Sequence, residues 1–240
     1  MKYFASVSYD GSKFYGFQKL NDYDTVQKEL ERALGIINKS YVAVKGAGRT
    51  DRGVHAYSQG ISFELNGGIP ASKLKNVINR VLNDYVHINY VEEVSDDFHP
   101  RFDAVKKKYE YVINLGEFDP IINDYVYNYN NKLNIKKMRS ASKSFIGFHS
   151  FKAFTSGDRE NYNSVIYKIK FKRKGDFLTI TFVGKSFYRY MVRNMVGALI
   201  QAGNNKLDKN DIKIMLDKEK VNCKYNTAPA CGLYLVNVYY

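Results

Sequence analysis

The order of predicted strands and helices repeats in the two halves of the chain. In the first half, apolar periodicity and turn residues predict strands at 2–9, 41–45, 55–65 and 86–94 and helices at 26–37 and 71–82. The same signals in the second half predict strands at 107–115, 165–173, 177–185 and 233–239 and helices at 135–146 and 188–202. Both halves therefore have the order β-α-β-β-α-β.

This repeated order predicts an α+β fold made of two tandem ferredoxin-like halves, each with a largely antiparallel sheet and its helices on one face. We place the boundary near residues 97–106, which gives domains of residues 1–104 and 105–240. A short additional helix is expected at residues 209–218, before the last strand. A basic cleft between the two halves is the expected ligand site.

The charge of the chain points to a polyanionic partner. Its 37 Lys and Arg residues exceed its 24 Asp and Glu residues, and the resulting net charge of +13 is spread along the sequence. Nucleic acid is the usual partner of such a protein. An anionic membrane surface is the weaker alternative, because no lysine-rich amphipathic helix stands out. No run of eighteen apolar residues occurs, and we expect a cytoplasmic protein with no membrane partner.

The cysteines and histidines do not form a recognisable metal pattern. Two cysteines, Cys223 and Cys231, are too far apart for a C-x-x-C pair, and we interpret them as reduced thiols. The four histidines have spacings that match no zinc motif: His55, His87, His99 and His149. We therefore expect no metal site.

One glycine-rich segment, residues 45–56, reads KGAGRTDRGVHA and holds Asp51 between Arg49 and Arg52. A carboxylate beside fixed positive charge stays ionised, which suits a nucleophile or a charge stabiliser. Its glycines permit positive φ and close approach of a ligand to the backbone: Gly46, Gly48 and Gly53. The same residue types also make ordinary turns, so the segment alone leaves a site and a solvated turn both open. No phosphate-loop pattern occurs in the chain.

Several segments occur in one characteristic order along nearly the whole chain. They read YDGSKFYGFQ at 9–18, GRTDRGVHA at 48–56, FHPRFDA at 98–104, KYEY at 108–111, MVRN at 191–194 and GLYL at 232–235. In sequence and in order these segments resemble the motifs of the TruA family of tRNA pseudouridine synthases. The chain departs from the family pattern at three positions, where Pro100, Ser150 and Arg189 replace the usual residues.

The resemblance implies isomerisation of uridine to pseudouridine in the anticodon stem-loop of tRNA, at positions 38, 39 and 40. It implies no cofactor and no metal, tRNA and not DNA as the partner, and a homodimer. Asp51 would be the catalytic nucleophile. Attack at C6 of the base, attack at C1′ of the ribose and assistance to loss of the C2′ proton all remain open.

The resemblance also implies roles for three further residues. Arg49 would help to extrude the target nucleotide, and Tyr109 would lie against the target base. Since Tyr111 shares a face of the strand with Tyr109, one of the two is expected to be a core ring, and we choose Tyr109 for the site. Arg193 lies at the edge of the apolar arc of its helix and needs an acidic partner, for which we propose Asp51.

Two other classes of protein remain as alternatives. A non-catalytic RNA-binding protein with tandem RRM-like units would have the same order of elements and a basic surface. The segment 174–177, KGDF, resembles the start of an RNP1 motif, but Asp176 stands where that motif has an aromatic residue. A structural ribosome-associated protein would explain the charge. Neither alternative gives Asp51 a role.

Overall fold

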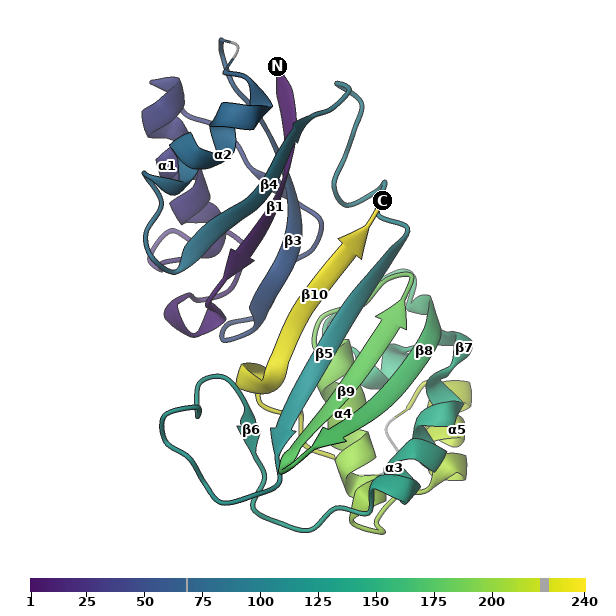
Figure 1. The fold of residues 1–240 in the computed structure, drawn as a ribbon. Helices are drawn as coiled ribbons and strands as arrows, with labels where there is room; N and C mark the ends of the chain where they lie inside the picture. Colours follow the sequence, from purple (N-terminus) through teal and green to yellow (C-terminus); the bar gives the residue numbers. More distant parts are fainter. Residues whose placement is uncertain (68, 221–224) are drawn as a thin grey trace. The chain divides into compact units, whose positions relative to one another are not determined.

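The computed structural model describes residues 1–67, 69–220 and 225–240 and shows a mixed α+β protein whose strands pair mostly antiparallel (Figure 1). The chain forms two compact units. Unit 1 contains Met1–Val105 together with the C-terminal residues Tyr234–Tyr240, and unit 2 contains Lys106–Leu233. The units are described separately.

Unit 1 is built on strand β1 (Lys2–Tyr9), which pairs antiparallel with β3 (His55–Glu64) on one side and β4 (Val86–Glu93) on the other. Helices α1 (Val26–Asn38) and α2 (Ala71–Asn79) cover one side of this sheet (Figure 1). All five elements lie where the sequence predicts them, although α2 ends three residues before the predicted end.

The apolar spacing of the two helices explains their packing. Leu30 and Leu34 of α1 are buried one turn apart, as are Leu74 and Ile78 of α2. Residues at i and i+4 share a helix face, so each pair presents one apolar stripe to the sheet. Side chains of the sheet, such as Ile88, complete this core.

The second edge of β3 is divided between two short pairings. Strand β2 (Lys45–Gly46) pairs antiparallel with one end of β3, opposite Ser62 and Ile61. Strand β10 (Leu233–Tyr239) pairs parallel with the other end, where Tyr234 and Leu235 lie opposite His55 and Ala56.

Two predictions differ from this arrangement. The strand predicted at 41–45 is reduced to β2, because the N–H of Val44 donates to the Glu31 carboxylate and its carbonyl accepts from the Gln27 amide, instead of pairing with a strand. The last strand was predicted in the domain of residues 105–240, but all of β10 except its first residue, Leu233, belongs to unit 1. Beside it, the ring of Tyr240 packs edge-on against Phe4, with the ring centroids 4.9 Å apart.

The strands of unit 2 form an antiparallel series in the order β5 (Lys106–Asn114), β9 (Phe177–Gly184), β8 (Asn163–Lys174) and β7 (Gly147–Ser150). A short strand, β6 (Tyr127–Asn128), pairs parallel with β5. The hairpin predicted between β8 and β9 is confirmed, since Lys174 pairs with Phe177 across a turn in which Gly175 has a φ of 58°. Strands β6 and β7 were not predicted, because they are too short to show a period.

Helices α3 (Ile135–Ser142), α4 (Met191–Gly203) and α5 (Lys209–Lys218) lie together on one side of the unit 2 strands (Figure 1). Helix α3 ends four residues before its predicted end, where the chain tightens into a 3₁₀ turn. Helix α4 begins three residues later than predicted, because Tyr190 has the left-handed conformation with a φ of 62°.

Two helical glycines offer a matched test of this packing. A Cβ on Gly197 of α4 would overlap the backbone oxygen of Asn226, whereas a Cβ on Gly35 of α1 would meet its nearest neighbour, the oxygen of Ser40, at 3.6 Å. We expect Gly197→Ala to lower the free energy of unfolding by about 1–3 kcal/mol. Gly35→Ala should raise it by about 0.5–1 kcal/mol through helix propensity. Urea unfolding followed by circular dichroism measures both, and equal effects of the two changes would contradict the close approach at Gly197.

Candidate active site

Asp51 lies in the loop between β2 and β3 of unit 1. Its side chain is half-buried, whereas Arg49 and Arg52 are exposed and Thr50 between them is buried. The N–H of Val54 donates to the carbonyl of Asp51 at 3.1 Å and closes a tight turn. The loop therefore anchors Thr50 and presents its charged side chains near the surface.

The glycines of this loop have different roles. Gly53 has a φ of 79°, which suits the third position of a type II turn. Gly46 and Gly48 have no positive φ, so Gly53 is the glycine of this loop at which the expected positive φ occurs. At Gly46 a Cβ would overlap the ring of Phe17. The missing side chain therefore makes room for the protein's own aromatic ring.

Buried hydrogen bonds fix the loop from below. The hydroxyl groups of Tyr9 and Thr50 share a hydrogen bond of 2.8 Å, and both residues are buried. The side-chain amide of Gln59, which is 0% exposed, donates to the carbonyl of Gly48 at 2.8 Å. In a low-dielectric interior such bonds hold the backbone firmly, because breaking them leaves polar groups unsolvated.

The motif at residues 9–18 supports the same loop. The N–H of Phe17 donates to the carbonyl of Thr50 at 3.1 Å. Gly16 has a φ of 100°, and a Cβ there would lie 2.9 Å from the same carbonyl oxygen. The two motifs are separated in sequence but form one structural unit, in which the first holds the backbone around Asp51.

His55 closes the far end of the loop. It is 3% exposed, and its ring stacks on Tyr234 with the centroids 4.8 Å apart. The N–H of Gly11 donates to its Nδ1 at 3.1 Å, and Asp10 Oδ1 lies 3.3 Å from the same nitrogen. No role was predicted for this histidine from the sequence, because the spacing of the histidines matches no zinc motif. Its position in a motif shared with Asp51 was the signal for a supporting role.

The two tyrosines of β5 have different environments in unit 2. Tyr111 is 0% exposed, and its hydroxyl donates to the carbonyl of Pro229 at 2.8 Å. Burial raises the pKa of Tyr111 well above its ordinary value. Tyr109 is 9% exposed and packs edge-on against Phe187 at 5.0 Å. Both tyrosines are buried, and Tyr111 is the one that is fully enclosed in the core, whereas Tyr109 keeps a small exposed fraction.

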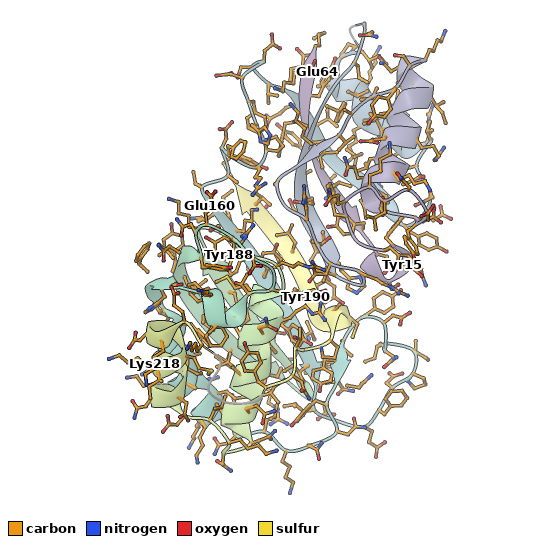
Figure 2. All side chains as sticks on the ribbon, turned by 180° about the vertical axis from the view of Figure 1, so that it is seen from behind. Tyr15, Glu64, Glu160, Tyr188, Tyr190 and Lys218 are labelled. Carbon is orange, nitrogen blue, oxygen red and sulfur yellow. The ribbon has the colours of Figure 1, made fainter. Side chains whose placement is uncertain are left out.

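Arg193 projects from the first turn of α4 and is half-buried. Its Nε donates to the carbonyl of Ala228 at 2.7 Å, and the N–H of Ala228 donates back to the carbonyl of Arg193 at 3.2 Å. Its guanidinium lies over the ring of Tyr190, 4.9 Å from the centroid. Figure 2 labels Tyr190 just before this helix. Tyr190 has a positive φ, which is uncommon for a residue other than glycine and could not be predicted from the sequence.

A row of lysines marks one face of the unit 2 sheet. They alternate along β8 and are all exposed: Lys168, Lys170, Lys172 and Lys174. The β9 residues that pair with these lysines alternate with the buried Ile180 and Phe182. The lysines therefore lie on the sheet face opposite to that of Ile180 and Phe182. The ammonium group of Lys170 lowers the pKa of the neighbouring Lys168. Like charges held this close are stabilised by an anion.

The remaining sequence expectations concern metals, thiols and membranes. Within the ranges that the structure describes, no group of three or more His, Cys, Asp or Glu residues could hold a metal ion. Cys231 is a half-buried free thiol whose pKa is raised by burial, and Cys223 lies outside the described residues. None of the described helices has the length and apolar character of a membrane span.

The predicted site residues are divided between the units. Asp51 and Arg49 lie in the loop of unit 1, Tyr109 on β5 and Arg193 on α4 of unit 2. The loop is the feature that defines a class of protein: a carboxylate fixed on a glycine-rich turn between two arginines, in a basic α+β chain.

Comparison with known proteins names this class. Residues 5–103 and 141–240 match the family model described as tRNA pseudouridine synthase. The chain is 43% identical to tRNA pseudouridine synthase A of Pseudothermotoga lettingae, over 99% of this chain and 98% of the relative. It is 38% identical to the protein of that name from Mycoplasmoides gallisepticum, over 98% and 89%. With the Bacillus subtilis protein it shares 37% identity over 100% and 99%. The chain belongs to the tRNA pseudouridine synthase family.

The buried hydroxyl pair beneath the loop can be tested by a double-mutant cycle. We expect Thr50→Val to lower the free energy of unfolding by about 1–3 kcal/mol, because a buried hydroxyl group of Tyr9 loses this hydrogen bond. Tyr9→Phe added to Thr50→Val should recover part of that loss, since both ends of the bond are then apolar. Denaturant unfolding of the four proteins measures the coupling. Additive losses would show that the two hydroxyl groups act independently.

Proposed function

We propose that this protein isomerises uridine to pseudouridine in tRNA, with Asp51 as the nucleophile. The observation that carries the proposal is the half-buried Asp51, held on a loop whose backbone is fixed by buried hydrogen bonds. Membership of the tRNA pseudouridine synthase family supports this reaction. A purely RNA-binding protein would have no use for a carboxylate placed in this way, because it faces a negatively charged ligand.

The reaction exchanges one bond for another. The N1–C1′ bond of uridine breaks, the uracil turns while it is held, and a C5–C1′ bond forms. The proton at C5 is released to solvent, and N1 gains a proton. Asp51 starts this sequence by attack at C6 or C1′, or by assisting loss of the C2′ proton. No oxidant or reductant is consumed, because the product is an isomer of the substrate.

We propose the remaining roles from the motif resemblance. Arg49 is exposed beside Asp51 and replaces the stacking that the target nucleotide loses when it leaves its helix. Tyr109 contacts the target base, and the burial of Tyr111 in the core favours this choice. Arg193 acts together with the Asp51 carboxylate and keeps it charged and oriented.

The anticodon stem-loop is the proposed substrate within tRNA, at positions 38, 39 and 40. The net charge of +13 and the lysine row of β8 support an RNA partner bound through its phosphates. Tandem RRM-like binding without catalysis remains the second candidate. A positively charged surface favours both candidates, so the experiment must measure chemistry.

Release of tritium from C5-labelled uridine in tRNA tests the reaction. We expect wild type to release tritium from an anticodon stem-loop. Asp51→Asn should lower the rate of tritium release by about 1,000-fold or more, which is the magnitude expected when a catalytic nucleophile is lost. RNA affinity should change less than about tenfold, because the variant loses negative charge and keeps the loop.

Asp84→Asn is the matched control, because Asp84 is an exposed carboxylate elsewhere in unit 1. It should retain wild-type turnover. If wild type binds tRNA but releases no tritium from any tRNA, the RNA-binding candidate is correct and the proposed enzyme is not.

Two changes at Arg193 test its role. Arg193→Ala should reduce kcat by about 100-fold or more, as expected for loss of a charge that orients a catalytic group. Arg193→Lys retains the charge but cannot reproduce the guanidinium donors, so it should restore only part of the rate. Thermal unfolding of both variants identifies any loss that comes from the bond to Ala228. Near-normal turnover of a folded Arg193→Ala protein would refute the assignment.

A further inference from the structure

Three planar side chains form an exposed stack beside the Asp51 loop. The Cζ atom of Arg52 lies over the ring of Tyr15, 4.1 Å from its centroid. The rings of Tyr15 and Tyr23 are stacked at 4.3 Å with an interplanar angle of 27°. Tyr15 is 42% exposed and Tyr23 is 46% exposed, and Arg52 is also exposed. Figure 2 shows Tyr15 at the surface of unit 1.

Backbone hydrogen bonds hold this stack in place. The N–H of Tyr15 donates to the carbonyl of Asp24 at 2.8 Å, which brings the two ends of the intervening loop together and sets Tyr23 against Tyr15. The next residue, Gly16, is packed against Thr50 and Arg52, because a Cβ there would lie 2.9 Å from the oxygen of Thr50 and 3.3 Å from the nitrogen of Arg52. The stack is therefore fixed to the loop that carries the nucleophile.

The composition of the stack indicates what it binds. A cation over an exposed ring contributes little to stability, and an exposed pair of stacked rings keeps much apolar surface in water. Single-stranded RNA is recognised by surfaces of this kind, on which unpaired bases stack against aromatic rings and guanidinium planes. Since every base has a π face, such stacking tolerates different sequences.

The position of the stack indicates which base it holds. Arg52 directly follows Asp51, so their Cα atoms are about 3.8 Å apart. A nucleotide that reacts at Asp51 therefore places a neighbouring nucleotide beside Arg52. When the target base leaves its helix, its neighbours lose a stacking partner, and a flat protein surface replaces it.

We propose that Arg52, Tyr15 and Tyr23 form a stacking platform for one unpaired nucleobase, that of a nucleotide adjacent to the target uridine. This assignment rests on the proposed function and extends it from the reacting nucleotide to its neighbour. Arg49 and the platform then have separate tasks. Arg49 acts on the nucleotide that leaves the helix, and the platform holds the strand beside it.

The test combines protein variants with RNAs that lack one base. A series of anticodon stem-loops carries an abasic nucleotide at each position flanking the target uridine, and Kd, KM and kcat are measured for each RNA. For wild type we expect one flanking position at which loss of the base weakens binding by about 5- to 100-fold. Tyr15→Leu should weaken binding of the intact RNA to a similar extent and show no further loss with that abasic RNA. KM should change more than kcat.

Three further variants separate stacking from fold. The coupling is the loss of RNA affinity that the abasic nucleotide causes. Arg52→Lys keeps the charge without the planar group and should reduce this coupling. Tyr15→Phe keeps the ring and should retain the coupling that Tyr15→Leu loses. Tyr90→Leu removes a tyrosine of β4 that is 49% exposed and should leave the coupling at the wild-type value. If Tyr15→Leu fails to fold, Tyr23→Leu and Arg52→Lys provide the same comparison at exposed positions.

The outcomes distinguish the platform from the reaction. If every abasic penalty is the same in wild type and in the variants, the platform is overturned, while tritium release by wild type still supports the proposed function. If Tyr15→Leu lowers kcat equally on all RNAs, the platform is also overturned. That pattern would mean that Tyr15 only stabilises the Asp51 loop and does not contact a base. Absence of tritium release by wild type removes the proposed function itself.

Discussion

The contacts of Thr50 are the constraint on which the candidate site depends. Its hydroxyl is bonded to Tyr9 of β1, and its carbonyl accepts the N–H of Phe17. A threonine held at both its side chain and its backbone restrains the backbone of the residues that adjoin it. The half-buried Asp51 is thereby held in a defined loop, although it lies outside every strand and helix. The cost of ordering a loop is met before any substrate arrives, which is the physical basis of preorganisation.

Much of the fold could be predicted because its main elements have strong periods and clear ends. Strand β1, helix α1 and the β8–β9 hairpin lie where alternation, helical spacing and the Lys-Gly-Asp turn predict them. Strands β2, β6 and β7 are too short to carry a period. The pairing of β10 with β3 joins distant parts of the chain, and a local pattern contains no information about it. The tandem ferredoxin-like arrangement stays a prediction.

The candidate site was predictable as a set of residues but not as a geometry. Asp51 stood out because a carboxylate between two arginines in a glycine-rich turn is an unusual combination. Its sequence could not show that Arg52 stacks on Tyr15, because that contact depends on how two loops pack. Nor could it show the left-handed backbone of Tyr190, which side-chain chemistry does not require. Contacts between segments and backbone angles are the properties that only the folded chain displays.

The placement of β10 has a consequence for biosynthesis. Unit 1 is formed by Met1–Val105 together with Tyr234–Tyr240, so one of its strands follows the whole of unit 2 in the sequence. Domains generally fold as units while the chain is being synthesised. Here the start of β3, directly after the loop of Asp51, has no parallel partner until the segment that follows unit 2 has been synthesised. The edge of β3 beside the Asp51 loop is therefore completed only after unit 2 has been made, so a chain that stops before residue 234 lacks this parallel pairing.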